Sequence, residues 1–136
     1  MEIRNISKLL YQLKLINQEM VTKFEKKTGF SITRYEILMF IQDNEFCTQT
    51  ALQTALHIDR AAITRHLKIL ENKAYITRQR NSDNNREISV SLTNLAKEKL
   101  KACETKQHDD KHKKFSMPLN AIEQEQLSKL LTKLIQ

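Results

Sequence analysis

The stretch TQTALQTALHIDRAAITRHLKILENKAYITRQRNSDNNREISVSL, residues 48–92, decides the fold of this chain. Its pattern predicts a helix, a short turn and a second helix, and then two strands around a polar loop. These elements are expected at about 49–56, 60–72, 75–80 and 87–92. Thr48 and Asp59 should cap the two helices, because their side-chain oxygens can accept hydrogen bonds from free N–H groups. The order is that of a helix-turn-helix followed by a two-stranded hairpin, or wing.

The second of these helices has two chemically different faces. Ile63, Leu67 and Leu70 recur at helical spacing and should be buried. The opposite face carries side chains suited to reading DNA, namely Arg60, Ala61, Thr64, Arg65 and Lys68. Arginine can pair bidentately with guanine, and threonine or alanine can contact the methyl group of thymine. The solvated face of an ordinary amphipathic helix is the alternative interpretation, and the elements on either side favour DNA.

The predicted wing carries further basic side chains. In its first strand Ile76, Arg78 and Arg80 should face one way, and the residues between them the other. Arg86 lies close to the turn, and the second strand alternates between apolar residues and serines. An arginine at a wing tip can enter a minor groove, where narrow A·T-rich stretches concentrate negative potential. The three wing arginines are therefore candidate DNA contacts.

Composition narrows the class of protein. The 136 residues suit a single domain, the 40% of apolar residues suffice for a core, and one glycine with one proline favours long helices. The net charge of +7 and the pI of about 9.5 suit a polyanionic partner, of which nucleic acid is the commonest. The sequence contains no phosphate loop, nucleophile elbow or zinc-protease helix, so we expect neither an enzyme nor a cofactor.

The sequence also bears on location. The longest apolar run, residues 37–41, is too short to span a membrane, and the first residues contain no apolar signal region. Two cysteines are no disulfide framework. We therefore expect a cytoplasmic protein with no membrane partner.

Long apolar stripes lie on both sides of the helix-turn-helix. Residues 3–27 are predicted to form one helix, with Gly29 ending it in a left-handed conformation. Further helices are expected over about 33–43, 94–115 and from 120 onward. Asn120 and Glu123 should form a capping box at the start of the last helix. The first and last stripes need a partner, and we expect them to pair with a second copy of the chain.

The whole pattern resembles the MarR family of winged-helix transcription regulators. The resemblance is carried by DRAAITR at 59–65, KAYI at 73–76 and VSLT at 90–93, which are similar to the two ends of that family's recognition helix and to the close of its wing. It implies that Arg86 is the wing arginine and that Asn84 stands in place of the wing aspartate. Ala74 replaces the usual glycine, at a cost of about 1 kcal/mol if its backbone is left-handed.

The resemblance implies a mainly α fold: a winged helix-turn-helix of about six helices plus a two-stranded wing, dimerising through its N- and C-terminal helices. It implies one domain over 1–136, with a DNA-binding lobe at 30–93 and dimerisation helices at 1–28 and 94–136. Two recognition helices of a homodimer would enter successive major grooves of a near-palindromic operator, about 34 Å apart. Most such regulators repress, and many release DNA when a small aromatic or amphipathic effector favours another lobe spacing.

Three sets of residues are candidates for sensing, namely the aromatic Tyr11, Phe24, Tyr35 and Phe40, the thiol of Cys47, and His108 with His112. The aromatic residues can line a ligand cavity, although aromatic residues at helical spacing more often form core. Cys47 precedes a predicted helix N-terminus, whose dipole can lower the pKa of a thiol and favour redox sensing. The two histidines are spaced i, i+4, as in a metal-sensing regulator, but lysines surround them and no further ligands complete a site.

A winged-helix module for protein–protein interaction is the alternative from another class. Such modules usually lose the basic recognition face. Arg60, Arg65, Lys68 and Arg86 are all present here, which favours DNA.

Overall fold

The structure, a computed structural model, describes residues 2–80, 83, 87–108 and 116–135. Its helices and strands follow one another in the order α1 (Ile3–Ile16), the π-helical η1 (Asn17–Val21), α2 (Thr22–Thr28), α3 (Ile32–Asp43), β1 (Phe46–Thr48), α4 (Gln49–Leu56), α5 (Arg60–Asn72), β2 (Ile76–Arg80), β3 (Ile88–Leu92), α6 (Asn94–His108) and α7 (Ala121–Ile135). The fold is mainly α, as predicted, and it contains the expected winged helix-turn-helix.

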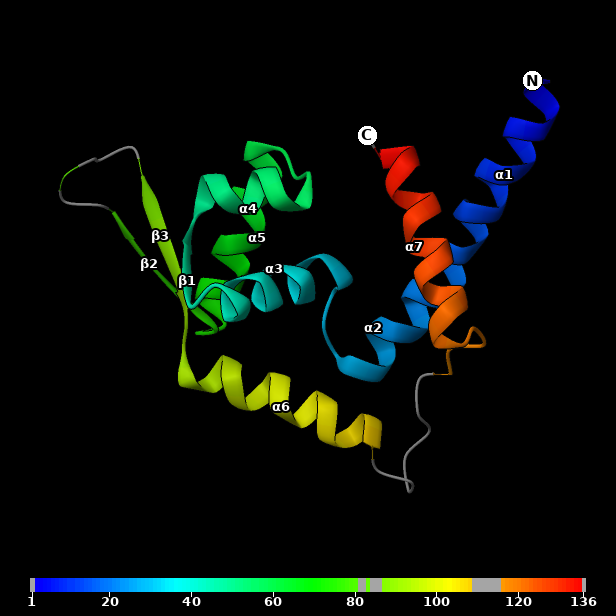
Figure 1. Ribbon diagram of the computed structural model, residues 1–136. Coiled ribbons are helices and arrows are strands. Elements are labelled where there is room, and N and C mark those ends of the chain that lie inside the picture. The colour runs from blue at the N-terminus through cyan, green and yellow to red at the C-terminus, as the bar shows by residue number, and fades with distance from the viewer. Residues whose placement is uncertain (1, 81–82, 84–86, 109–115, 136) are drawn as a thin grey trace.

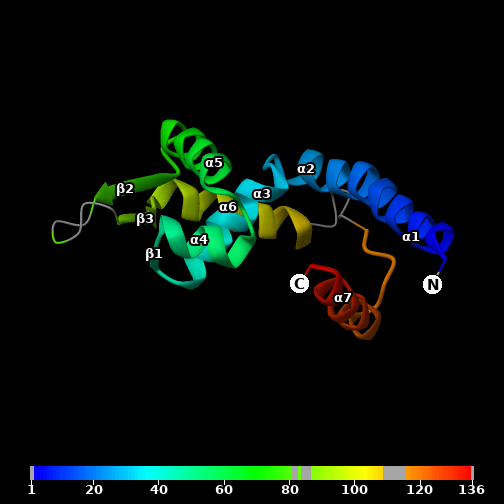
Figure 2. The same ribbon diagram turned by 90° about the horizontal axis from the view of Figure 1, so that it is seen from above.

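The elements divide into a lobe and two terminal arms. α3 to α5 and the sheet gather at one end of the molecule, and the β2–β3 hairpin projects away from the terminal helices (Figure 1). α1 and α2 form a rod that leads away from the lobe, which both views show (Figures 1 and 2). None of the described helices combines the length and the hydropathy needed to cross a membrane.

The helix ends are set by local side-chain hydrogen bonds. Thr48 Oγ1 accepts from the N–H of Ala51 at 3.0 Å, and Asp59 Oδ1 accepts from the N–H of Ala62 at 2.7 Å. Each bond satisfies one donor that the first turn of a helix leaves free. Before α7, Asn120 and Glu123 exchange side-chain bonds to each other's N–H at 2.9 Å each, which confirms the capping box.

Two residues adopt the left-handed conformation that the sequence suggested. Gly29 ends α2 with φ 78°, and Ala74 follows α5 with φ 62°. For alanine this conformation costs about 1 kcal/mol. The carbonyl of Ala74 accepts from Thr93 Oγ1 at 2.7 Å, so the turn after α5 is tied to the end of β3.

The sheet has three strands: the predicted two-stranded wing is confirmed as β2 and β3, and a third strand, β1, was not predicted. β3 lies in the middle and pairs antiparallel with β2 and with β1, where Cys47 lies opposite Val90. β1 is only three residues long, too short for an alternating pattern to appear in the sequence. Its pairing holds the start of α4 against the wing.

The first helix also differs from the prediction. Residues 3–28 contain α1 and α2 separated by η1, a five-residue π-helical segment, instead of one regular helix. Such segments insert extra residues into a helical turn and shift the apolar stripe around the axis. α6 is described over Asn94–His108, and residues 109–115 of the expected longer helix lie outside the described residues.

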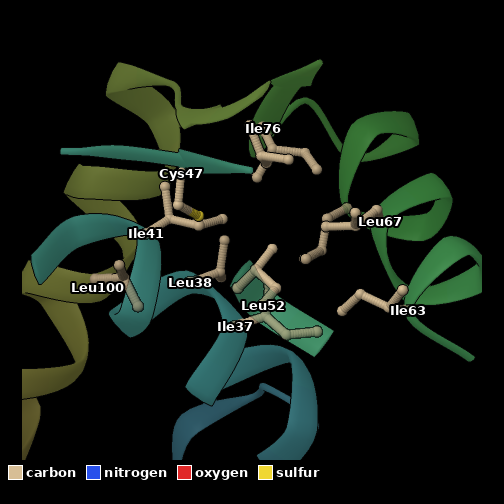
Figure 3. Packing of buried hydrophobic residues seen from close by; sticks show 11 residues of the cluster. Ile37, Leu38, Ile41, Cys47, Leu52, Ile63, Leu67, Ile76 and Leu100 are labelled. Atoms are coloured by element: carbon tan, nitrogen blue, oxygen red, sulfur yellow. The ribbon is translucent and has the colours of Figure 1, made fainter. Parts of the chain in front are cut away.

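The hydrophobic core of the described residues lies in the lobe, and α6 adds Leu100 to it. Side chains from α3, α4 and α5 converge with those of the sheet, and Figure 3 shows Leu38, Leu52 and Leu67 pointing toward one another. The buried members are Ile37, Leu38, Ile41, Cys47, Leu52, Ile63, Leu67, Leu70, Ile76, Val90 and Leu100. This packing fixes α5 against the lobe and leaves its other face to solvent.

Candidate nucleic-acid interface

α5 presents the predicted polar face to solvent. Ile63 and Leu67 are fully buried, and Leu70 is 1% exposed. The five candidate DNA-contacting residues of this helix are all exposed: Arg60, Ala61, Thr64, Arg65 and Lys68. The side chain of Asp59 caps the first turn of α5 but does not cover it. This end of the helix can therefore enter a groove.

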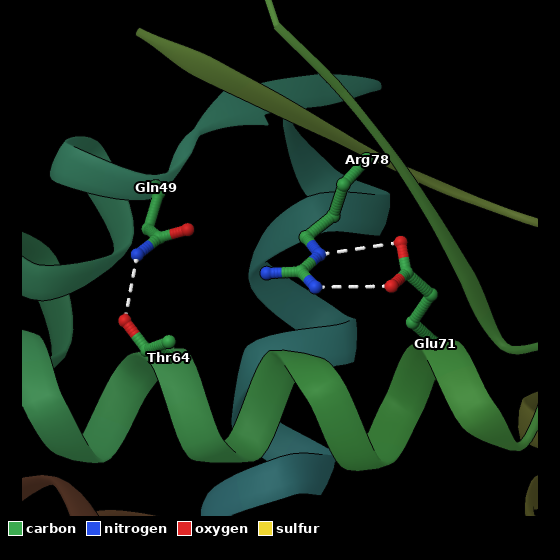
Figure 4. A network of polar contacts seen from close by, with 4 residues as sticks. All are labelled: Gln49, Thr64, Glu71 and Arg78. Atoms are coloured by element: carbon green, nitrogen blue, oxygen red, sulfur yellow. Dashed lines mark hydrogen bonds and ion pairs between the residues drawn. The ribbon is translucent and has the colours of Figure 1, made fainter. Parts of the chain in front are cut away.

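Thr64 is held in one orientation by two hydrogen bonds. Its Oγ1 donates to the carbonyl of Arg60 at 2.8 Å and accepts from Nε2 of Gln49 at 3.1 Å, the second of which Figure 4 shows. Gln49 is the first residue of α4, and sequence reasoning missed it because a polar residue at that position is ordinary. With the hydroxyl engaged in this way, the methyl group is the part of Thr64 that remains for a base.

Arg78 of the wing is engaged within the lobe. Its Nε and Nη2 donate to the two carboxylate oxygens of Glu71, at 3.2 and 3.0 Å (Figure 4). The hydrogen bond from Arg78 is the main reason that the pKa of Glu71 lies below its usual value. Glu71 stands in the last turn of α5, and sequence reasoning missed this partner because seven residues and a turn separate the two.

The other wing candidates are only partly described. Arg80, at the end of β2, is exposed. Asn84 and Arg86 lie outside the described residues. The structure therefore places Arg78 and Arg80 on the stem of the hairpin.

A second polar contact joins α3 to the recognition helix. Nη1 of Arg34 lies 3.4 Å from Nδ1 of His66. Because a guanidinium can only donate, Nδ1 must accept, which requires a neutral imidazole. Burial, together with the charges of Arg34 and Arg65, holds the pKa of His66 below its usual value.

The aromatic candidates for an effector site do not gather in one place. Phe24 and Tyr35 meet edge to face, with ring centroids 5.3 Å apart, where α2 meets α3. Phe40 packs against the lobe core. Tyr11 is 58% exposed on α1 and lines a depression of about 500 Å³ whose other described residues come from the same helix. The structure thus brings together only the first two.

The environment of Cys47 contradicts the expected lowering of its thiol pKa. The side chain is 8% exposed and points into the core with Ile41 (Figure 3). Burial raises the pKa of Cys47, because an apolar environment disfavours the thiolate. The residue lies in β1 rather than in the first turn of α4, so desolvation outweighs the helix dipole.

The histidine pair falls largely outside the described residues. His112, like the side chain of His108, lies outside the described part of the chain. Within that part, no three His, Cys, Asp or Glu side chains stand close enough to hold a metal ion.

Known proteins share this sequence pattern. Residues 30–88 match the model of the MarR family. The chain is 38% identical over 96 residues to the uncharacterized HTH-type transcriptional regulator YdgJ of Bacillus subtilis, covering 71% of this chain and 58% of that protein. It is 34% identical over 77 residues to the regulator SarZ of Staphylococcus epidermidis, covering 57% and 52%. The chain thus spans little more than half the length of these two relatives.

Longer matches exist at lower identity. The multiple antibiotic resistance protein MarR of Salmonella typhimurium is 25% identical over 134 residues, covering 98% of this chain and 93% of that protein. Among solved structures, a mutant MarR from E. coli complexed with operator DNA superimposes with a TM-score of 0.81 at 24% identity, covering 97% and 96%. A probable transcriptional regulator from Pseudomonas aeruginosa gives 0.75 at 25% identity, covering 91% and 94%. The chain belongs to the MarR family.

Proposed function

We propose that this chain is a sequence-specific, double-stranded DNA-binding transcription regulator. The observation that carries the proposal is the exposed face of α5, where two guanidiniums, an ammonium and a threonine stand opposite a fully buried apolar stripe. Arginine reads guanine, and small apolar groups read the thymine methyl, in a groove wide enough for a helix. The net charge of +7 supports a polyanionic partner.

The regulator acts as a homodimer, with residues 30–93 as the DNA-binding lobe and residues 1–28 and 94–136 as the dimerisation helices. Apolar side chains on α1 and α7 support this division, because large ones remain exposed there in the single chain, such as Leu10 at 58% and Leu130 at 59%. Two lobes related by a two-fold axis bind a near-palindromic operator. We also propose that the protein acts in the cytoplasm.

The regulator represses, and a small aromatic or amphipathic effector releases it. The junction of α2 with α3 supports this part, because Phe24 and Tyr35 meet there between the terminal helices and the lobe. A ligand that separates these rings changes the angle at which the lobe leaves the dimer. It lowers DNA affinity only by as much as it prefers the altered arrangement.

The test is fluorescence anisotropy with two labelled duplexes. One carries the sequence that the protein selects from a random library, and the other is a scramble of it. The expected result is affinity for the selected duplex at least about 10³-fold above the scramble, with a steep dependence on salt. Equal affinity for both duplexes contradicts a sequence-specific regulator. A low-salt titration without binding contradicts DNA binding altogether.

A further inference from the structure

The contact between Arg78 and Glu71 joins the two parts of the lobe that would read DNA. Glu71 belongs to the last turn of α5, and Arg78 lies in the middle of β2. The guanidinium uses its Nε and Nη2 edge to meet both carboxylate oxygens, at 3.2 and 3.0 Å (Figure 4). A two-point contact of this kind fixes orientation as well as distance.

The strand register places Arg78 on the inner face of the hairpin. Its partner across the ladder is Val90, which is fully buried, and it shares a face with Ile76, which is 2% exposed. The side chains of Arg78 and Glu71 are 22% and 40% exposed. The guanidinium therefore leaves the strand toward α5.

The β2–β3 hairpin is attached to the lobe at its base, so a small rotation at the base displaces the far end of β2 by a larger amount. The orientation of the base must therefore be fixed. The β2–β3 hairpin projects from the lobe (Figure 1). Four residue steps from Ile76 to Arg80 span about 13 Å at about 3.3 Å each, so a rotation of about 10° at the base moves Arg80 by about 2 Å. A displacement of that size breaks a hydrogen bond at the far end.

We infer that Arg78 is a positioning residue: its fork with Glu71 sets the wing against the recognition helix, and its guanidinium does not bind a phosphate. This inference rests on the proposed function. It replaces the earlier assignment of Arg78 as a DNA contact. The alternative is that Glu71 merely holds Arg78 until DNA takes it over.

Glu71→Gln separates the two roles, because they predict opposite signs. The substitution removes an acid from a DNA-binding lobe and frees the guanidinium. If Arg78 binds phosphate, the variant binds both duplexes more tightly, because the guanidinium no longer has to leave the Glu71 carboxylate, and the log–log slope with salt stays that of the wild type. If the fork positions the wing, binding to the selected duplex weakens about tenfold with the slope unchanged.

Three further variants complete the experiment. Arg78→Gln should match Glu71→Gln in affinity and slope if the role is positioning, whereas loss of a phosphate contact lowers the slope by about 0.9. Glu36→Gln removes an exposed acid from α3, within the lobe, and serves as the charge-matched control. The double variant Glu71→Arg, Arg78→Glu rebuilds the ion pair in reverse and should recover binding. Circular dichroism checks that every variant is folded.

The outcomes are distinct. Weaker, slope-neutral binding by both single variants, with recovery in the reversed pair, supports the positioning role. Tighter binding by Glu71→Gln, unchanged binding by both single variants, or no recovery in the reversed pair overturns it while leaving the regulator intact. A wild type that binds the selected and scrambled duplexes equally overturns the proposed function and this inference together.

Discussion

At the scale of single residues, hydrogen bonding decides what each side chain can offer a partner. Thr64 is exposed, yet its hydroxyl already donates to the carbonyl of Arg60 and accepts from Gln49. A hydroxyl so engaged gains little by also meeting a base. The sequence correctly placed Thr64 on the outer face, because helical spacing alone determines the face. It could not show which of the two groups on Cβ points outward, because that depends on Gln49 from another helix.

The residue-scale prediction concerns the methyl group of Thr64. Thr64→Val should bind the selected duplex as the wild type does, since the methyl group is kept. Thr64→Ser should bind about fourfold more weakly, for the loss of one buried methyl at about 0.8 kcal/mol.

Duplexes with uracil in place of individual thymines provide the check. Wild-type affinity should fall at one position in each half-site, and Thr64→Ser should be indifferent to that same change. If the valine variant loses binding and the serine variant keeps it, the hydroxyl is the reading group.

At the scale of elements, local signals were predictable and long-range pairing was not. The caps at Thr48, Asp59 and Asn120 depend on neighbours within three residues, and all three were predicted. β1 was missed because its stability comes from β3, more than forty residues away. Alternation correctly placed Arg78 beside Ile76. The carboxylate that it meets could not be foreseen, because it depends on how β2 packs on α5.

The element-scale prediction is a pH dependence of the contact between α3 and α5. His66 must be neutral to accept from Arg34, and its pKa is lowered in the folded protein. Below the unfolded value of about 6.5, the unfolded chain therefore binds more protons than the folded one. The free energy of unfolding should fall as the pH drops from there through the lowered pKa of His66.

Urea unfolding at several pH values between 8 and 5, each about one unit apart, measures this effect. His66→Asn keeps an acceptor near the position of Nδ1 and cannot be protonated, so it should lose part of the decline. His57→Asn is the matched control, because His57 is exposed and takes no part in the contact between Arg34 and His66. This variant should show the same decline in the free energy of unfolding as the wild type. An equal decline in wild type and His66→Asn would exclude His66 as the source.

At the scale of the whole molecule, the lobe has a hydrophobic core of its own, whereas large apolar side chains on α1 and α7 remain exposed in the single chain. The buried core uses residues between Ile37 and Leu100. α1 and α7 contribute none of the buried residues described there, although both carry apolar stripes. The sequence predicted these stripes and their need for a partner. It could not locate the π-helical segment that shifts the first stripe, because that shift is a backbone property.

The whole-molecule prediction is that charge on these stripes dissociates the dimer without unfolding the lobe. Leu10→Glu and Leu130→Glu should each sediment as a monomer. The circular dichroism spectrum of each variant should remain helical, which shows that the lobe is still folded. Affinity for the selected duplex should fall about 10²-fold, because the second lobe no longer binds at high effective concentration.

Lys8→Gln changes the net charge by the same amount on the polar side of α1 and should remain dimeric. Sedimentation equilibrium across a concentration series measures all three variants. Dimerisation of Leu10→Glu and Leu130→Glu with wild-type affinity would contradict the assignment of these helices.

The separation of the core from the terminal arms has a consequence for how such proteins diverge after gene duplication. In the proposed dimer, substitutions on α1 and α7 change which copies pair, and none of the described residues of these two helices belongs to the lobe core. Substitutions on the outer face of α5 change which sequence the proposed regulator reads, and this face lies outside the terminal helices. Two duplicated copies can therefore stop exchanging subunits before, or after, they come to recognise different sites.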